Sequence, residues 1–242
     1  MVLKILLLQA RNPNDPVRHE ERQSFAEKTG LAVEQIVPWD LLGGPPTLSE
    51  ARMFDAVMVG GSGDYYVSKR SLPHFEAQLE FLGDIVATGH PMFASCFGFH
   101  ILVRALGGEV IHDPGRTEVG TYELTLTTAG KEDELLGRLP EKFAAQMGRK
   151  DRATKLPPGV LHLAASELNP NQALRVPSQP IWTTQFHPEL DEETNRGRFL
   201  RYRSGYTAHM TPKEQRDALE SRFGPSPETH MLLPAFLKLV FG

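Results

Sequence analysis

A single cysteine, Cys96, lies in the segment MFASCFGFH (residues 92–100), between an apolar run and a stretch with helical spacing. In open α/β sheets, ligand sites lie beyond the carboxyl ends of the strands, and Cys96 falls at such an end. A thiol on a tight strand-to-helix turn points into the site, and the helix N-terminus favours its thiolate. The position therefore suits a nucleophile, and the alternative is a small cysteine buried in the core.

A histidine with a nearby carboxylate follows another apolar strand. His187 lies in QFHPEL, and Glu189 comes two residues later. A thiolate nucleophile works with a base, and a carboxylate orients that base and stabilises its charged form. These residue types predict acyl transfer by a Cys–His–carboxylate triad. A hydrogen-bonded loop histidine is one alternative, and a metal site is a weaker one, because two side chains do not supply three or four ligands.

A glycine-rich loop, VMVGGSGDYYV (residues 57–67), follows a third apolar run. Gly60 and Gly61 allow backbone N–H groups to approach a substrate closely, as an oxyanion requires. The loop has no Gly-Lys-Ser/Thr, which excludes a phosphate-binding P-loop. Ser62 is not in G-x-S-x-G, because Asp64 occupies the place of the last glycine.

A common sheet would bring these three segments together. In the first half of the chain, apolar runs alternate with segments whose apolar residues have helical spacing. We expect strands at residues 2–10, 32–39, 54–61 and 90–96, and helices at residues 18–29, 73–88 and 97–106. This alternation predicts a parallel sheet with helices on both faces.

The second half has short strands without long helices between them. We expect strands at residues 121–128, 142–148, 160–166, 173–177 and 181–190, and helices at residues 191–203, 211–223 and 233–241. The helix at 191–203 begins with acids and continues with arginines, an order that suits the helix dipole. We expect these arginines to form a solvated face; they are Arg196, Arg198, Arg201 and Arg203.

The composition is that of an ordinary soluble protein: 242 residues, 40% apolar and 23% charged. The net charge of −4 gives no reason to expect nucleic acid or an anionic membrane as a partner. One cysteine excludes an intramolecular disulfide, so the cytoplasm is the expected compartment. Neither the first nor the last apolar run has the length of a signal h-region or a membrane span.

Taken in order, VGGSGDYY, ASCFGFH and QFHPEL resemble the class I glutamine amidotransferase family. The family pattern is a Gly-Gly strand end, then G-x-C-x-G-x-Q, then a late H-P-E. GVLHLAASELNPNQALRV also resembles the GMP-synthase-like branch of the family. The resemblance implies a flavodoxin-like, doubly wound and mostly parallel α/β sheet over residues 1–195. Residues 196–242 are then expected to form a C-terminal helical extension packed on the same domain.

The resemblance also implies residue roles. Cys96 is the nucleophile, His187 the base and Glu189 its orienting acid, and the N–H groups of Gly61 and Phe97 form the oxyanion hole. The expected reaction is hydrolysis of a small-molecule amide, glutamine, through a γ-glutamyl thioester, with neither a metal nor an organic cofactor. Family members pass the ammonia to a synthetase, which we expect here to be a separate chain.

Three positions depart from the family pattern. Ala94 replaces the first glycine, His100 replaces the glutamine four residues after the cysteine, and Arg149 stands where a histidine is usual. His100 and Arg149, with Gly60 and Ser62, are the expected substrate-binding residues. The changes leave two further interpretations open: a hydrolase of another amide or γ-glutamyl compound, and a non-catalytic binding protein on this fold.

Overall fold

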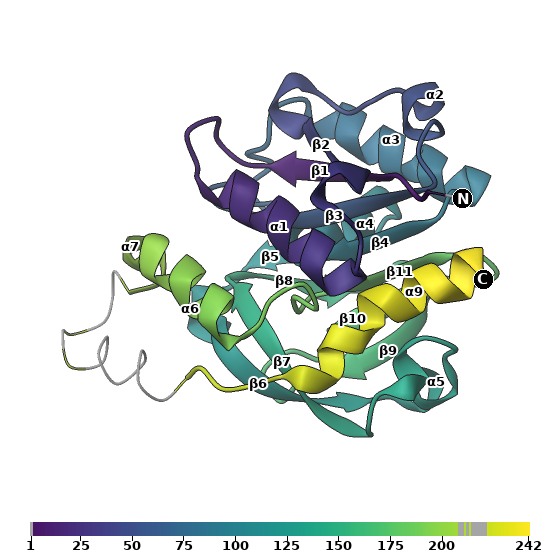
Figure 1. Ribbon diagram of the computed structural model, residues 1–242. Helices are drawn as coiled ribbons and strands as arrows, with labels where there is room; N and C mark the ends of the chain where they lie inside the picture. Colours follow the sequence, from purple (N-terminus) through teal and green to yellow (C-terminus); the bar gives the residue numbers. More distant parts are fainter. Residues whose placement is uncertain (1, 208–210, 212, 214–221) are drawn as a thin grey trace.

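The computed structural model describes residues 2–207, 211, 213 and 222–242, and its strands form two sheets (Figure 1). The strands are β1 (Ile5–Ala10), β2 (Ile36–Asp40), β3 (Ala56–Ser62), β4 (Met92–Ser95), β5 (Glu109–His112), β6 (Glu118–Leu126), β7 (Lys142–Arg149), β8 (Asp151–Lys155), β9 (Leu161–Ala165), β10 (Ala173–Val176) and β11 (Ile181–Thr184). The helices are α1 (Val17–Thr29), α2 (Leu48–Ala51), α3 (Phe75–Thr88), α4 (Phe97–Ala105), α5 (Thr128–Glu132), α6 (Glu192–Arg201), α7 (Arg203–Thr207) and α9 (Leu232–Phe241).

Within the described residues, nine strands make one mixed sheet in the order β2-β1-β3-β4-β11-β10-β9-β6-β7, and β5 pairs with β8 in a second sheet. The strands from β2 to β11 run parallel to one another. Those from β11 to β7 pair antiparallel. The sheet therefore has a parallel half made by the βα units and an antiparallel half made by the short strands.

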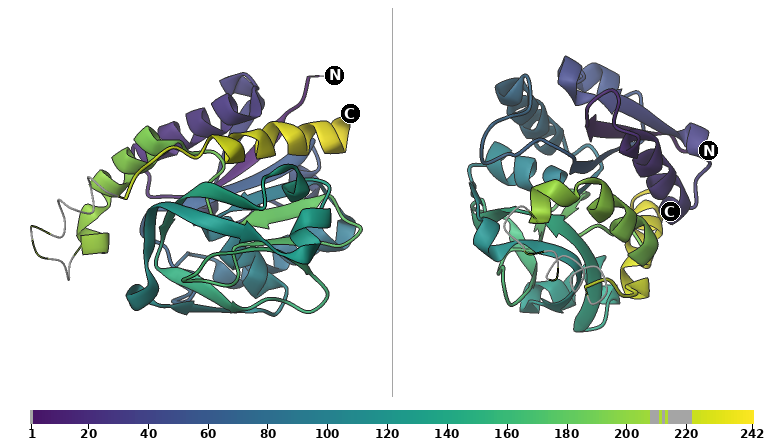
Figure 2. Two further views of the ribbon diagram at one scale, coloured as in Figure 1. Left: turned by 90° about the horizontal axis from the view of Figure 1, so that it is seen from below. Right: turned by 90° about the vertical axis from the view of Figure 1, so that its left-hand side faces the viewer.

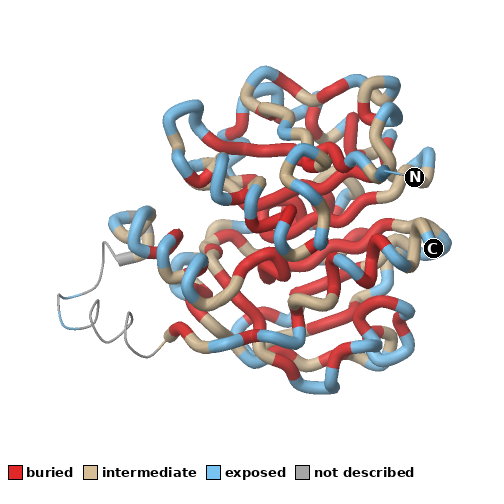
Figure 3. The backbone as a smooth tube through the Cα atoms, viewed as in Figure 1, coloured by how far each residue is buried: buried red, intermediate tan, exposed pale blue. Residues whose placement is uncertain are grey.

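The inner parallel strands β1, β3 and β4 are buried on both faces, which explains their continuous apolar sequences, whereas the edge strand β2 is only partly buried. In β1, Ile5 and Leu7 pack on the face covered by α1 and α9, whereas Leu6 and Leu8 pack on the face covered by α3 and α4. Figure 2 shows α1 and α9 side by side, and Figure 3 shows the buried strands between exposed helix surfaces. The predicted sheet with helices on both faces is confirmed.

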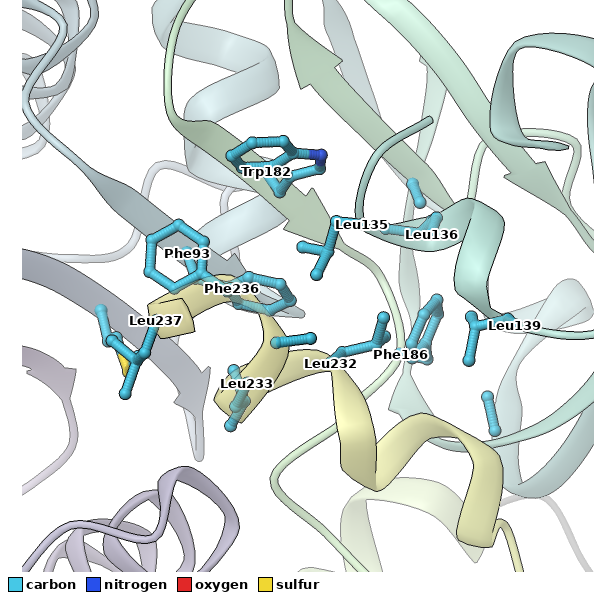
Figure 4. Close-up of a cluster of buried hydrophobic side chains, with 14 of the residues drawn as sticks. Phe93, Leu135, Leu136, Leu139, Trp182, Phe186, Leu232, Leu233, Phe236 and Leu237 are labelled. Atoms are coloured by element: carbon cyan, nitrogen blue, oxygen red, sulfur yellow. The ribbon is translucent and has the colours of Figure 1, made fainter. Parts of the chain in front are cut away.

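Helix α9 completes the core on the face of α1 (Figure 4). Leu232 and Phe236 are fully buried. The ring of Phe236 lies edge-on to those of Phe93 and Trp182, at 5.7 and 6.0 Å between centroids. Burial of this apolar face stabilises the fold by the hydrophobic effect. Among the described residues, no helix has the length and apolar character to cross a membrane.

Most predicted elements are confirmed within a few residues, and the differences have local causes. Residues 33–35 form a 3₁₀ helix, so the strand predicted at 32–39 begins only at Ile36. The strand predicted at 181–190 ends at Thr184 because the chain turns there toward His187. The pairing of β5 with β8 was not predicted, and most of the helix predicted at 211–223 lies outside the described residues.

Candidate active site

The three segments singled out by their sequence meet at one edge of the sheet. Strands β3, β4 and β11 are neighbours and run parallel, so their carboxyl ends lie together. Gly61 lies at the end of β3, Cys96 directly follows β4, and His187 follows β11 by three residues. The sheet order thus places side chains from distant parts of the sequence around one site.

Cys96 has the backbone of a sharp strand-to-helix turn. Its φ of 53° and ψ of −99° lie in a region that L residues other than glycine rarely adopt. The Cys96 N–H donates to the carbonyl of Thr184 at 2.8 Å, and the Cys96 carbonyl accepts the N–H of His100 at 3.1 Å. Such strain costs about 1–3 kcal/mol and gathers at functional sites. Neighbouring strand and helix therefore fix the position of the thiol, whose Sγ lies 3.8 Å from the carbonyl oxygen of Gly148.

Gly98 allows the helix after Cys96 to lie directly on the sheet. A Cβ at this position would lie 2.8 Å from Val59 Cβ and 2.9 Å from Ala94 Cβ. Because strand atoms at these positions cannot move aside, we expect Gly98→Ala to lower the free energy of unfolding by about 1–3 kcal/mol. Urea denaturation followed by circular dichroism measures the effect.

The matched control for this prediction is Gly83→Ala, in the middle of α3. A Cβ there would meet nothing within 4 Å, so the better helix propensity of alanine is expected to stabilise the protein by up to about 1 kcal/mol. Equal destabilisation by the two variants would contradict the close packing of Gly98.

His187 and Glu189 form a buried hydrogen-bonded pair in the loop after β11. The His187 Nδ1 lies 2.6 Å from Glu189 Oε1, and the backbone N–H of His187 donates to the carbonyl of Gln146 at 2.9 Å. An ionised carboxylate only accepts, so Nδ1 carries the proton and Nε2 is left for the thiol. Glu189 is fully buried and His187 is 5% exposed.

Charge, rather than burial, determines the protonation of this pair. Burial lowers the pKa of His187, but the negative charges of Glu189 and Cys96 and their hydrogen bonds raise it to about 10. Burial raises the pKa of Glu189, but the charges of His187 and Arg198 lower it overall. The arrangement therefore favours an imidazolium paired with the Glu189 carboxylate.

Arg198 corrects one expectation from the sequence. We expected it on a solvated face of its helix, but it is 7% exposed, and its Nη1 lies 3.7 Å from Glu189 Oε1. The cause is the packing of α6 over the antiparallel half of the sheet (Figure 1). Arg198 thus belongs to the surroundings of Glu189.

The glycines at the end of β3 lie against buried charged side chains. A Cβ on Gly60 would lie 2.5 Å from Glu21 Oε1, and one on Gly61 would lie 3.0 Å from His187 Cε1. The N–H of Gly61, which we expected to face an oxyanion, instead donates to Glu21 Oε1 at 3.1 Å. Glu21 accepts from Arg11 as well, at 2.8 Å. In this structure the Gly61 N–H is therefore engaged by the Glu21 carboxylate.

Two hollows meet at Cys96, and Ser62, Gly148 and Tyr206 line both of them. The first, called here the Tyr66 cleft, is further lined by Tyr65, Tyr66, Phe97, His100, Lys150 and Asp151. The second, called here the His187 hollow, is further lined by Gly61, His187, Asn195, Arg198 and Tyr202. The thiol thus borders one hollow that is lined by the histidine and another that is not.

Four of the predicted site residues line the Tyr66 cleft, namely Ser62, Phe97, His100 and Arg149. Ser62 donates its hydroxyl to the Tyr65 carbonyl at 2.6 Å, and Phe97 begins α4, where a backbone N–H has no partner within the helix. His100 is 3% exposed, and among the described residues its Nε2 has no hydrogen-bond partner. Burial, opposed by the charge of Asp151, lowers the pKa of His100 to about 4, so its imidazole is neutral at pH 7.

The guanidinium of Arg149 is used inside the protein. Its Nε donates to Glu118 Oε2 at 2.8 Å, its Nη2 donates to the same oxygen, and its Nη1 donates to the Asp151 carbonyl at 3.3 Å. Both charged side chains are buried. We expected Arg149 to bind substrate, but these bonds fix its side chain to Glu118 on the neighbouring strand.

Replacement of Glu118 tests this buried pair. We expect Glu118→Gln to lower the free energy of unfolding by about 3–5 kcal/mol, because it leaves the Arg149 charge uncompensated. Adding Arg149→Met is expected to recover part of that loss. The control is Glu123→Gln on the same strand, whose ion pair with Lys142 is exposed and contributes about 0–1 kcal/mol. Equal effects of the two single variants in chemical denaturation would contradict the prediction.

The sequence did not single out several residues of the site. Tyr66 belongs to the glycine-rich loop itself (residues 57–67), so its place near the site was open to prediction from that loop. Lys150 directly follows Arg149, which the family pattern had singled out, so its place near the site was open to prediction as well. Tyr206 gave no such signal, because α7 reaches the site only through the tertiary fold. Among the described residues, no group of three or more histidine, cysteine, aspartate or glutamate side chains is arranged to hold a metal ion.

Known proteins with similar sequences are glutamine-hydrolysing enzymes. One subunit of the glutamine-hydrolysing GMP synthase of Methanocaldococcus jannaschii is 36% identical over 100 residues, 41% of this chain and 51% of the relative. The glutamine-hydrolysing GMP synthase of Thermosipho africanus is 37% identical over 117 residues, 48% of this chain and 22% of the relative. The chain thus spans about half the length of the first relative, and less of the second.

Solved structures share the fold. A glutamine amidotransferase from Thermotoga maritima superposes with a TM-score of 0.70 at 16% identity, covering 100% of both chains. One from Methylobacillus flagellatus has a TM-score of 0.69 at 18% identity, covering 99% of this chain and 90% of the other. The model of the family "Glutamine amidotransferase class-I" matches residues 35–203, well over half of the sequence. This chain therefore belongs to the class I glutamine amidotransferase family.

Proposed function

We propose that the protein hydrolyses the side-chain amide of glutamine with Cys96 as nucleophile, His187 as base and Glu189 as orienting acid. The observation that supports this most is the turn at Cys96, which holds the thiol beside a histidine whose other nitrogen is bonded to a buried carboxylate. This is the arrangement that nucleophilic acyl transfer needs.

In the first half of the reaction, the Cys96 thiolate attacks the amide carbon, and the carbonyl electrons move to the oxygen. As the tetrahedral intermediate collapses, the carbon–nitrogen bond breaks and His187 gives its Nε2 proton to the departing ammonia. A γ-glutamyl thioester remains on Cys96. Because His187 lines only the second of the two hollows described above, we place the ammonia in the His187 hollow and the acyl group in the Tyr66 cleft.

In the second half, water takes the place of ammonia beside His187. His187 removes a proton from the water as its oxygen attacks the thioester carbon, and the carbon–sulfur bond then breaks. Glutamate leaves and the thiolate is restored, so the balance is one amide and one water giving one carboxylate and one ammonium ion.

Backbone N–H groups stabilise the oxyanion in both halves. Phe97 supplies one, at the N-terminus of α4. Gly61 supplies the second N–H donor. In the structure this N–H donates to the Glu21 carboxylate, so it must turn from Glu21 toward the substrate before it can stabilise the oxyanion. The release of Gly61 from Glu21 is thus part of the proposed reaction.

The ammonia is proposed to serve a synthetase on a separate chain. The support is that some relatives are named as one subunit of a glutamine-hydrolysing GMP synthase. The second candidate function is hydrolysis of another amide or γ-glutamyl compound. It is favoured by His100, whose buried neutral ring occupies the cleft where the family pattern has a glutamine.

A glutamine-hydrolysis assay combined with labelling by a thiol-reactive glutamine analogue separates these functions. Labelling of Cys96 together with release of ammonia from glutamine is the expected result. Labelling without turnover of glutamine would favour the second candidate. Absence of both would contradict a catalytic role and would favour a binding protein on this fold.

A further inference from the structure

Three polar atoms surround one small space of the His187 hollow, beside the α-carbon of Gly148. A Cβ on Gly148 would lie 3.6 Å from Tyr206 Oη and 3.9 Å from Asn195 Oδ1. It would also lie 3.9 Å from His187 Nε2, the nitrogen that Glu189 leaves free. Apart from Gly148 and its chain neighbours, these are the three heavy atoms nearest that point. They belong to α7, α6 and the loop after β11, so the tertiary fold assembles the space.

Asn195 presents an oxygen to this space because its nitrogen is used inside the protein. Asn195 is 2% exposed, and its Nδ2 donates to Gln146 Oε1 at 2.9 Å and to the Met147 carbonyl at 3.2 Å. Two acceptors around this nitrogen fix the orientation of the amide, since only its NH₂ group donates. Among the described residues, nothing donates to Asn195 Oδ1. A buried acceptor is therefore left for a ligand.

The hydroxyl of Tyr206 offers a second acceptor. It donates its hydrogen to the Gly148 carbonyl at 2.9 Å, and among the described residues nothing donates to Oη. Burial and the charge of Cys96 raise the pKa of Tyr206, so the group stays a neutral hydroxyl. The Tyr206 ring packs on that of Phe199, at 5.9 Å between centroids. Tyr206 lies beyond residues 35–203, which match the family model, so the family resemblance assigns it no role.

The chemistry of this space fits the nitrogen that leaves the substrate. The NH₂ group of a primary amide has two N–H bonds, and it departs as ammonia after it takes the Nε2 proton of His187. Two acceptors and one acid thus face a group with two donors and one lone pair. The free volume of the His187 hollow is about 30 Å³, which is room for about one or two molecules of the size of water or ammonia.

We propose that Asn195 Oδ1 and Tyr206 Oη are catalytic groups that accept the two N–H bonds of the departing nitrogen. They stabilise the positive charge that this nitrogen gains as His187 protonates it. In the second half of the reaction, the water that replaces ammonia gives one hydrogen to His187 Nε2 and donates the other to one of these oxygens, so that its lone pair is directed at the thioester carbon. The inference rests on the proposed function, since it assumes that Cys96 attacks an amide.

Tyr206→Phe tests this assignment, because it removes Oη and retains the ring that packs on Phe199. We expect kcat for glutamine to fall about 10- to 100-fold, with KM within about threefold, since the lost bond is made to a nitrogen that becomes charged in the transition state. The comparison is alkylation of Cys96 by the chloromethyl ketone analogue of glutamine, in which CH₂Cl replaces the amide NH₂. Its rate is expected to stay within about twofold, because this group has no N–H to donate.

Asn195→Leu is expected to show the same pattern, with a loss of glutamine turnover and retained alkylation of Cys96. Because the variant also removes a donor from Gln146, urea denaturation establishes that it is folded under the assay conditions. The matched control is Tyr122→Phe on β6. It removes a hydroxyl from a tyrosine that lines neither hollow, and it is expected to change neither rate.

Unchanged glutamine turnover in Tyr206→Phe would overturn the inference. Equal losses of turnover and alkylation would overturn it as well, because they would show that the hydroxyl supports the thiol or the fold rather than the departing nitrogen. A folded Asn195→Leu protein with the wild-type kcat would remove Asn195 from the assignment. If the wild-type protein neither releases ammonia from glutamine nor is alkylated by the analogue, the proposed function itself fails, and this failure is visible without any variant.

Discussion

Cys96→Ala is expected to lower kcat for glutamine hydrolysis by about 10⁵- to 10⁶-fold, to the level of the assay background. The variant removes the atom that forms the thioester, and the remaining hydrogen-bond donors give only a small residual rate. The fold is expected to persist, because alanine fits the space of a side chain that is itself almost fully buried. Ammonia release under saturating glutamine measures the loss.

The matched control is Ser95→Ala at the adjacent position. Ser95 is fully buried, and among the described residues its hydroxyl has no hydrogen-bond partner. Its removal is therefore expected to leave kcat within about threefold, because no bond is lost. A Cys96→Ala variant that stays folded and retains turnover would contradict the role of Cys96 as nucleophile.

Glu189→Gln is expected to lower kcat by about 10³- to 10⁴-fold, less than Cys96→Ala or His187→Ala. The amide cannot hold the imidazolium by charge, but the residues that make and break bonds remain. Loss of the negative neighbour also makes the imidazolium less stable. The titration midpoint of His187, followed by NMR of its ring proton, is therefore expected to fall from a pKa of about 10 toward 6.5.

Glu192→Gln is the control for this variant. Glu192 pairs with Arg196 at 3.1 Å on the surface of α6, so its replacement removes the same charge outside the site. Neither kcat nor the His187 midpoint is expected to move. Equal and complete losses in Glu189→Gln and Cys96→Ala, with altered circular dichroism of the glutamate variant, would show instead that Glu189 is mainly structural.

The candidate triad was predictable because each part follows an apolar strand. Cys96 and His187 lie at strand ends that a single-sequence pattern reveals, and Glu189 lies two residues from the histidine. What the pattern does not contain is that β11 pairs with β4, since about 90 residues separate the two strands in the chain and only the fold brings them together. The resemblance to the family implied that Cys96 and His187 act together, but this pairing of strands was not predicted.

The surroundings of the triad were not predictable in the same way. Arg198 is one of several arginines on a charged helix, and it is buried only because α6 packs over the antiparallel strands. The same holds for Glu21. Its carboxylate accepts a hydrogen bond from the Gly61 N–H because the fold brings α1 to the end of β3. Helical periodicity ranks polar residues as exposed, so it does not identify the few that tertiary packing buries with a partner.

The place of α9 in the core has a consequence for the order of events during biosynthesis. Cys96 and His187 leave the ribosome before residues 232–241, which cover Phe93 and Trp182 on the strands β4 and β11. Until that helix arrives, these two strands have an uncovered apolar face, and a domain folds as a unit. A nascent chain is therefore expected to hold its thiol and its histidine apart, and to gain a reactive cysteine only once translation has passed α9.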